Sequence, residues 1–277
     1  MVFAFAVVAL VGGQWPALDF YGQLQAQAGL ATGVVCLIAL STQRFWSLTF
    51  GLVCVLALAV NLQPHLALPA RVEPPARAVA PLRIVWANLR NWSTGPEALT
   101  KVLDTETPDI AILTELTVHH QPAVRAATAY AFRTSFPAGS AFDVLLMSRT
   151  QPADVRFDYT FGSDYPVLEA RYCSFAAAGQ CLTLVALHAP RPPLPGGMVG
   201  EPAKRRDGLL GLAATIARRR VQAGDQVILL GDFNATPYST AFREVERASG
   251  LADSAQAPAE HPVRPRPTWF STWPGIG

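Results

Sequence analysis

The chain has 277 residues, enough for one large domain or two small ones. Its formal net charge is only +2, which argues against a protein that coats nucleic acid, although it leaves room for an enzyme that cleaves a phosphodiester. Charged residues are unevenly distributed, since up to Ala70 the only acidic or basic residues are Asp19 and Arg44. This change in composition predicts the main domain boundary near Ala70.

Three uncharged apolar runs fill the first part of the chain: Met1 to Leu18, Leu24 to Leu40 and Phe45 to Leu62. Each is close to the lower limit of about 17 residues for a membrane-spanning helix. Aromatic residues stand at the ends of the runs, where a membrane interface favours them. A signal peptide would explain the first run but not the third. We therefore expect about three transmembrane helices within residues 1–63.

Arg44 is the only basic residue in the short loops between these runs. The excess of basic residues in cytoplasmic loops places Arg44 in the cytoplasm and directs the third run outward. The sequence thus predicts a multi-pass protein of the inner (cytoplasmic) membrane, with its soluble domain outside the cytoplasm, in the periplasm.

Residues 64–81 contain five prolines and little periodicity. Such a segment favours an extended, semi-rigid linker. The soluble domain is then expected over residues 82–277.

Polar residues follow four apolar strand patterns of this domain, at the point where each pattern ends. The strands are expected at Leu82 to Leu89, Ile110 to Leu113, Cys181 to Leu187 and Val227 to Leu230. The polar residues at their ends are Asn88, Glu115, His188, and Asp232 with Asn234. Buried carboxylates are costly unless they are paired or bind a metal, so the repeated placement of Glu115 and Asp232 favours a functional site.

The remaining elements complete an alternation of strands and helices. Helices are expected at Gly95 to Asp104, Arg205 to Arg220 and Ser239 to Ala248, and further strands at Ala141 to Arg149 and Val167 to Phe175. Cys173 and Cys181 would face each other across a hairpin. The sequence leaves two alternatives for these cysteines. They form a disulfide, which suits an oxidising compartment, or they remain unpaired on their strands.

Strand ends gather along one edge of a sheet, so the five polar residues are expected to meet. Asp232 and Asn234 point the same way if the extended geometry continues, whereas the alternative for this segment is an Asx turn without chemistry. Carboxylate and amide oxygens favour Mg²⁺ or Mn²⁺, and no thiolate is positioned for zinc. A Mg²⁺ ion held in this way polarises a phosphoryl oxygen and activates water.

The motifs around these residues resemble the endonuclease/exonuclease/phosphatase superfamily in their order and spacing. They are Ala87-Asn88-Leu89, Pro108 to Glu115, Leu187-His188 and Leu230 to Pro237. Thr114 stands where the family usually has Gln. The apolar start is similar to a membrane-anchored bacterial subgroup. The resemblance implies an α/β fold, a four-layer αββα sandwich of two mixed sheets packed face to face with helices outside.

The same resemblance implies a role for each residue in the in-line attack of water on a phosphoester. Glu115 would be the principal ligand of Mg²⁺, and Asn88 would support the metal or the phosphate. His188 would bind the scissile phosphate and stabilise its developing charge. Asp232 would orient or deprotonate the attacking water, and Asn234 would position this water and the phosphate.

One part of the family pattern is not matched. The family ends with an Asp-His pair, and Thr272 to Gly277 looks like the segment that leads into it. His261 is the only histidine after His188, and it precedes this segment. We therefore expect a chain truncated at its C-terminus, lacking the final segment of the domain.

Three readings remain open at this point. The first is a membrane-tethered, Mg²⁺-dependent phosphoesterase of the phosphodiesterase, nuclease or phosphatase type. Its substrate would be a nucleic acid, a nucleotide or a phospholipid head group, and no protein partner is expected. The second is a catalytically inactive, membrane-tethered domain that binds phosphate or a lipid head group. The third is a membrane protein whose strand ends are polar by chance. Metal binding without turnover would separate the first two.

Overall fold

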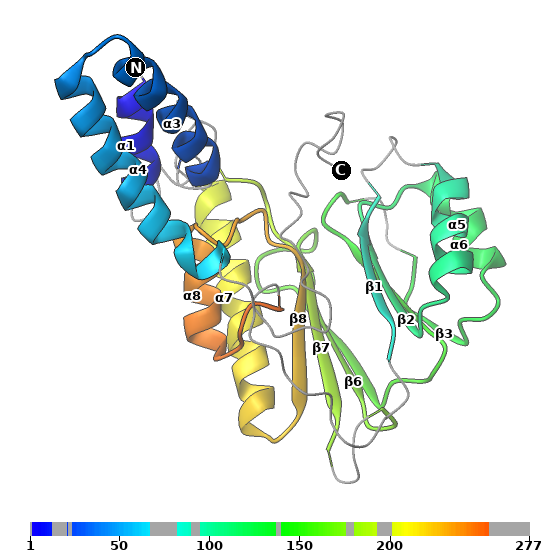
Figure 1. Ribbon diagram of the computed structural model, residues 1–277. Coiled ribbons are helices and arrows are strands. Elements are labelled where there is room, and N and C mark those ends of the chain that lie inside the picture. Colours follow the sequence, from blue (N-terminus) through cyan, green and yellow to red (C-terminus); the bar gives the residue numbers. More distant parts are fainter. Residues whose placement is uncertain are drawn as a thin grey trace, which may run out of the picture. The chain divides into compact units, whose positions relative to one another are not determined.

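The apolar patterns form helices and strands in the computed structural model, which describes residues 2–12, 21, 24–66, 82–89, 95–136, 140–175, 180–192 and 201–254 (Figure 1). Most of the expected linker and the C-terminal segment, including Thr272 to Gly277, lie outside the described residues. The chain divides into two units. One comprises residues 1–79 with residues 252–277, and the other residues 80–251.

The three apolar runs of the first unit each form a helix. These helices are α1 (Val2–Gly12), α3 (Gln25–Ser41) and α4 (Phe45–Leu66). Small side chains let them approach one another closely, since Ala6, Ala9 and Ala28 are fully buried beside Cys54 and Leu58. On the outer sides of α3 and α4 large apolar side chains are exposed, and Trp46 reaches 82% exposure. This unit therefore carries apolar surface that its own described helices do not bury.

The predicted transmembrane helices are wrong, and with them the predicted multi-pass location in the inner membrane. Among the described residues, no helix combines the length and the apolar character that a membrane crossing requires. A crossing takes about 20 apolar residues. Helix α1 has 11 residues and α3 has 17, while α4 ends in the mixed sequence Asn-Leu-Gln-Pro-His-Leu.

The second unit contains two mixed sheets of four strands each. In the first sheet the order is β1-β2-β4-β3. Its strands are β1 (Ile84–Asn88), β2 (Ile110–Thr114), β3 (Phe132–Arg133) and β4 (Val144–Ser148). Strands β1 and β2 are parallel, because helix α5 (Pro96–Glu106) carries the chain back between them, and the other pairs are antiparallel.

The second sheet has the order β5-β6-β7-β8. Its strands are β5 (Asp154–Asp158), β6 (Val167–Tyr172), β7 (Leu182–His188) and β8 (Gln226–Asp232). Strands β7 and β8 are parallel and are connected by helix α7 (Glu201–Gln222), whereas the remaining pairs are antiparallel. Each sheet thus contains one parallel pair, whose carboxyl ends lie together.

Helices cover the outer face of each sheet. Helix α5, the 3₁₀ helix η3 (Val118–His120) and helix α6 (Gln121–Ala126) pack on the first sheet, and α7 and α8 (Thr240–Ser249) pack on the second. A third apolar cluster, with Ile112, Leu146 and Leu184 fully buried, fills the space between the sheets. The two mixed sheets with flanking helices therefore fit the expected α/β sandwich.

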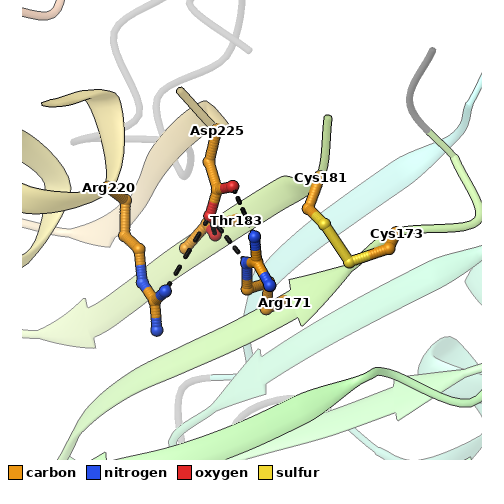
Figure 2. The surroundings of a disulfide bond; sticks show 6 residues. All are labelled: Arg171, Cys173, Cys181, Thr183, Arg220 and Asp225. Atoms are coloured by element: carbon orange, nitrogen blue, oxygen red, sulfur yellow. Dashed lines mark hydrogen bonds and ion pairs between the residues drawn. A yellow bond between two sulfur atoms is a disulfide. The ribbon is translucent and has the colours of Figure 1, made fainter. Parts of the chain in front are cut away.

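Four elements escaped the sequence patterns, namely η3, α6, β3 and β5. Strand β3 has two residues, α6 has six, and β5 alternates charged Asp154, Arg156 and Asp158 with two half-buried apolar residues at the sheet edge. The strand expected from Ala141 begins only at Val144, because residues 141–143 form a turn. Cys173 and Cys181 form a disulfide, which decides between the two open readings (Figure 2).

Candidate active site

The alternation of side chains along the strands brings the predicted residues to the mouth of the space between the sheets. Asn88, His188 and Asp232 each lie two residues after an inner-core side chain, namely Trp86, Ala186 and Leu230. Side chains two residues apart along a strand share a face. The polar residues therefore continue the inner faces of β1, β7 and β8, where the apolar core ends.

The Asn88 amide joins the carboxylates of the two sheets. Its Nδ2 atom donates hydrogen bonds to Glu115 Oε1 at 2.8 Å and to Asp232 Oδ2 at 3.1 Å. Glu115 follows β2 of the first sheet and Asp232 ends β8 of the second. Glu115 and Asp232 are far apart in sequence, 27 and 144 residues after Asn88, yet their carboxylates meet at its single amide group.

Glu115 has a backbone conformation that is rare for a residue with a side chain. Its φ is +54°, in the left-handed region, directly after the fully buried Thr114. Such a conformation costs of order 1 kcal/mol or more and persists where the surrounding structure requires it. Strain of this kind is concentrated at binding and catalytic sites, so it supports a functional assignment for Glu115.

His188 is held in one orientation by a backbone carbonyl. Its Nδ1 atom lies 2.8 Å from the carbonyl oxygen of Ala141. Because a carbonyl oxygen only accepts, Nδ1 carries a proton. The other ring nitrogen, Nε2, lies 3.7 Å from both Glu115 Oε1 and Asp232 Oδ2. The His188 side chain is only 3% exposed, so it presents little more than this edge to the site.

Gly231 allows β8 to pass close to β7 just before Asp232. Its φ is +144°, and a Cβ atom there would lie 2.0 Å from the carbonyl oxygen of Leu187. No other residue fits without moving one of the two strands. Asp232 is consequently held opposite His188 in the parallel register.

The extended geometry expected to continue to Asn234 does not do so. Asn234 has φ +45°, and its backbone N–H donates to Asp232 Oδ1 at 2.9 Å. The segment is thus an Asx turn, as in the alternative reading. The Asp232 carboxylate that forms this turn also accepts the hydrogen bond from Asn88. The Asn234 side chain is fixed separately, since Nδ2 donates to the carbonyl oxygen of Ala189 at 2.8 Å.

The charge of the two carboxylates is poorly compensated. Within the described parts of the chain, the ion-pairing partner of both Glu115 and Asp232 is His188, and neither contacts a lysine or an arginine. The donor set is one of hard oxygen atoms, which fits a divalent cation such as Mg²⁺. Across residues 2–254 as far as they are described, however, no three His, Cys, Asp or Glu side chains are arranged to hold a metal. Mg²⁺ commonly uses only one or two carboxylates together with waters and phosphate oxygens.

A separate pocket of about 230 Å³ lies on the helix-covered side of the first sheet, next to Leu103, Tyr130 and Arg149. It contains none of the five predicted residues. The sequence did not single out Ala141, which binds His188 through its backbone, or Phe142, whose ring packs against His188. A backbone contact leaves no sequence signal, and an isolated Phe before a strand resembles any core residue.

The model of the Endonuclease/Exonuclease/phosphatase family matches residues 85–277. The chain belongs to this family. This is a family of phosphoester hydrolases, and the assignment confirms the resemblance found in the motifs, although not the membrane-anchored subgroup. No curated protein matches the chain.

Solved structures are similar to the chain at low sequence identity. Sphingomyelinase C from Streptomyces griseocarneus is 18% identical, with 62% of this chain and 70% of that chain covered and a TM-score of 0.45. A humanized D. rerio TDP2 is 17% identical, with 63% and 72% covered and a TM-score of 0.46. A beta toxin from Staphylococcus aureus with bound magnesium ions is 12% identical, with 62% and 71% covered and a TM-score of 0.46. Sequence identities and TM-scores this low say nothing about the substrate of this chain.

Proposed function

We propose that this chain catalyses the Mg²⁺-dependent hydrolysis of a phosphoester by in-line attack of water. The observation that carries the proposal is the meeting of Glu115 and Asp232 at the Asn88 amide. Two partly buried carboxylates without a lysine or arginine partner in the described residues are costly unless a cation joins them.

Glu115 would hold the ion, and Asn88 would join it through its amide oxygen after rotation of the amide group. A bound Mg²⁺ supplies Lewis-acid polarisation of a phosphoryl oxygen and lowers the pKa of a bound water. Asp232, fixed through Oδ1 by the Asn234 backbone, would orient the attacking water and accept its proton.

His188, with a proton on both ring nitrogens, would donate a hydrogen bond to the phosphate through Nε2. Because Ala141 fixes the Nδ1 proton, the ring cannot turn its other edge to the site without losing this hydrogen bond. Asn234, held on the Ala189 carbonyl, would position the phosphate and the water. A nucleic acid, a nucleotide and a phospholipid head group all offer the phosphoester that this arrangement needs.

The second candidate is a catalytically inactive domain of the same fold that binds phosphate. One observation favours it, namely that the described residues offer no group of three or more acidic, histidine or cysteine ligands. Such a domain would bind phosphate at His188 and Asn234 without turnover.

The test is hydrolysis of bis(p-nitrophenyl) phosphate by the full chain with Mg²⁺, with Mn²⁺ or with EDTA. We expect turnover that needs the metal and is lost in Glu115→Gln and Asp232→Asn. The matched control is Asp104→Asn, at an exposed position of α5. Mn²⁺ binding by calorimetry without turnover would favour the inactive domain, and EDTA-resistant turnover would contradict the metal mechanism.

A further inference from the structure

A row of side chains leads away from His188. The ring of Phe142 packs against the His188 ring with centroids 4.9 Å apart, and Tyr165 packs on Phe142 at 4.7 Å. The guanidinium carbon of Arg205 lies 4.9 Å from the centroid of the Tyr165 ring. Phe142, Tyr165 and Arg205 are all half-buried, so each keeps part of its surface accessible. We call these three residues the Phe142–Tyr165–Arg205 row.

The row is built on three segments that are fastened to one another. Ser140 ties the turn that bears Phe142 to the loop that bears Tyr165. Its hydroxyl donates to the Asp164 carbonyl at 3.2 Å and accepts from the Phe142 backbone N–H at 3.2 Å. Two loops that would otherwise move independently therefore share one hydroxyl group. The row is preorganised, and preorganisation lowers the cost of binding a ligand.

Helix α7 is brought against the same loop by a glycine. A Cβ atom at Gly208 would lie 2.4 Å from the Phe161 ring, so only a glycine lets this ring lie directly against the helix. Arg205, nearly one turn earlier on α7, is thereby placed over Tyr165. A cation over an aromatic face is attracted by the negative charge of that face.

The charge of the row is positive. In the described part of the chain no carboxylate forms an ion pair with Arg205, whereas its neighbour Arg206 pairs with Asp207. Among the described side chains, the charge of this guanidinium is therefore not compensated. Aromatic faces bind quaternary ammonium groups, but here a fixed cation already occupies the face of Tyr165 and would repel a second one.

We propose that the Phe142–Tyr165–Arg205 row is the subsite for the organic group of the substrate, and that it selects an uncharged or anionic aromatic ring over a quaternary ammonium group. The inference rests on the proposed function, because it places the scissile phosphate at His188. Because neighbours already cover the faces of Phe142 and Tyr165, the substrate ring lies against their accessible edges, and Arg205 attracts any negative charge that the ring or its substituents carry.

The experiment compares three phosphomonoesters that share the phosphate group and differ in the organic group. They are thymidine 5′-monophosphate, phosphocholine and methyl phosphate, titrated calorimetrically into the full chain with Mg²⁺. We expect thymidine 5′-monophosphate to bind about 5- to 10-fold more tightly than methyl phosphate, since edge-to-face aromatic contacts give a gain of this order. Phosphocholine should bind no more tightly than methyl phosphate.

Variants assign the effect to the row. Phe142→Leu and Tyr165→Leu should each lower the affinity for thymidine 5′-monophosphate, relative to the affinity for methyl phosphate, by about 5-fold. Arg205→Gln should improve phosphocholine relative to methyl phosphate, and Arg205→Glu should improve it further. The control is Arg218→Gln, an exposed position on the same helix.

Each outcome separates the subsite from the proposed function. Equal binding of all three esters would overturn the subsite and leave the phosphate site intact, and tighter binding of phosphocholine would overturn the selection. Binding that follows the expected order without any hydrolysis would support the subsite and contradict the catalytic proposal. Absence of binding by all three esters would overturn both.

Discussion

The two ends of strand β8 carry carboxylates in opposite electrostatic situations. Asp225 stands just before the strand, with its side chain 2% exposed, and accepts hydrogen bonds from Arg171 Nε at 2.8 Å and Nη2 at 2.9 Å (Figure 2). The Thr183 hydroxyl donates to it at 2.8 Å. Asp232, at the other end, is 25% exposed, and its partners among the described residues are amide donors and an imidazole.

The difference indicates which end is built for stability and which for chemistry. Arg171 meets the charge of Asp225 with two parallel N–H donors, the strongest arrangement available to a carboxylate. Glu169, on strand β6 of the same sheet, is likewise bound by Arg219 and Arg220 of helix α7. At the Asp232 end no such cation closes the site among the described residues. One end of the sheet is therefore electrostatically complete, and the other is left open to a cation.

The comparison is tested most strongly by the pair Asp232→Asn and Asp225→Asn. We expect Asp232→Asn to lower kcat by about 10²- to 10⁴-fold, because it removes the group that accepts the proton of the attacking water. The melting temperature of Asp232→Asn should not fall, because replacing the carboxylate with an amide removes one of the two uncompensated negative charges of the site. Asp225→Asn should keep kcat per folded molecule. Steady-state kinetics on bis(p-nitrophenyl) phosphate measure kcat for both variants. A similar loss of kcat in the two would contradict the assignment of catalysis to the Asp232 end and of stability to the Asp225 end.

A backbone change at the open end should affect both properties at once. In Gly231→Ala the new Cβ would meet the Leu187 carbonyl, so β7 and β8 must separate where His188 and Asp232 face each other. We expect a loss of about 3 kcal/mol in the free energy of unfolding, together with a loss of turnover. Denaturant unfolding and activity assays measure the two effects.

The control for Gly231→Ala is Gly224→Ala. Gly224 also has a positive φ, +87°, but nothing lies within 4 Å of its added Cβ. This variant carries the conformational cost without the collision, and it should keep its turnover. Equal effects of the two substitutions would show that the close approach of the strands is not what holds Asp232 in place.

The sequence predicted the open end well because its residues occupy a repeated position. Each of Asn88, Glu115, His188 and Asp232 ends a short apolar run, and parallel strands bring such ends together. Strand membership and side-chain alternation are local properties, so they can be read from a few consecutive residues. The strain at Glu115 was not predicted, because no residue type there requires a positive φ, and the turn at Asn234 was one of two readings that the sequence left open.

The closed end could not be predicted from the same patterns. Asp225 and Arg171 are separated by 54 residues, and nothing in either neighbourhood indicates the other. The first unit shows the opposite error, since the lengths of apolar runs suggested membrane helices. Helices α1 and α3 are too short for this, since α1 has 11 residues and α3 has 17.

The disulfide offers a further test, because Cys181 stands at the start of β7 and His188 at its end. Replacing both cysteines in Cys173→Ser/Cys181→Ser frees a loop with a sequence separation of 8 residues. We expect a loss of about 2.5 kcal/mol in the free energy of unfolding, from the greater entropy of the unfolded chain. Turnover should be unchanged. A reducing agent should destabilise the parent chain to a similar extent and leave the variant unaffected, and a fall in kcat would contradict the separation of the two ends.

The smallest expected effect concerns the stability that Asp225 contributes and its dependence on pH. Asp225→Asn should cost about 2 kcal/mol in the free energy of unfolding, the value typical of hydrogen bonds to a charged group. The hydrogen bonds from Arg171, which outweigh the opposing effect of burial, hold the pKa of Asp225 below its ordinary value. A lowered pKa in the folded state means that this stability is fully present above the unfolded pKa of about 3.9 and is lost as the pH falls through the folded value.

The difference in unfolding free energy between parent and Asp225→Asn should therefore stay constant from pH 7 to about pH 5 and shrink below about pH 4. Urea unfolding at a series of pH values measures it, with Asp104→Asn as the exposed control. A difference that grows as the pH falls would mean that the carboxylate is destabilised in the folded chain, and that the two ends of β8 are less different than their hydrogen bonds indicate.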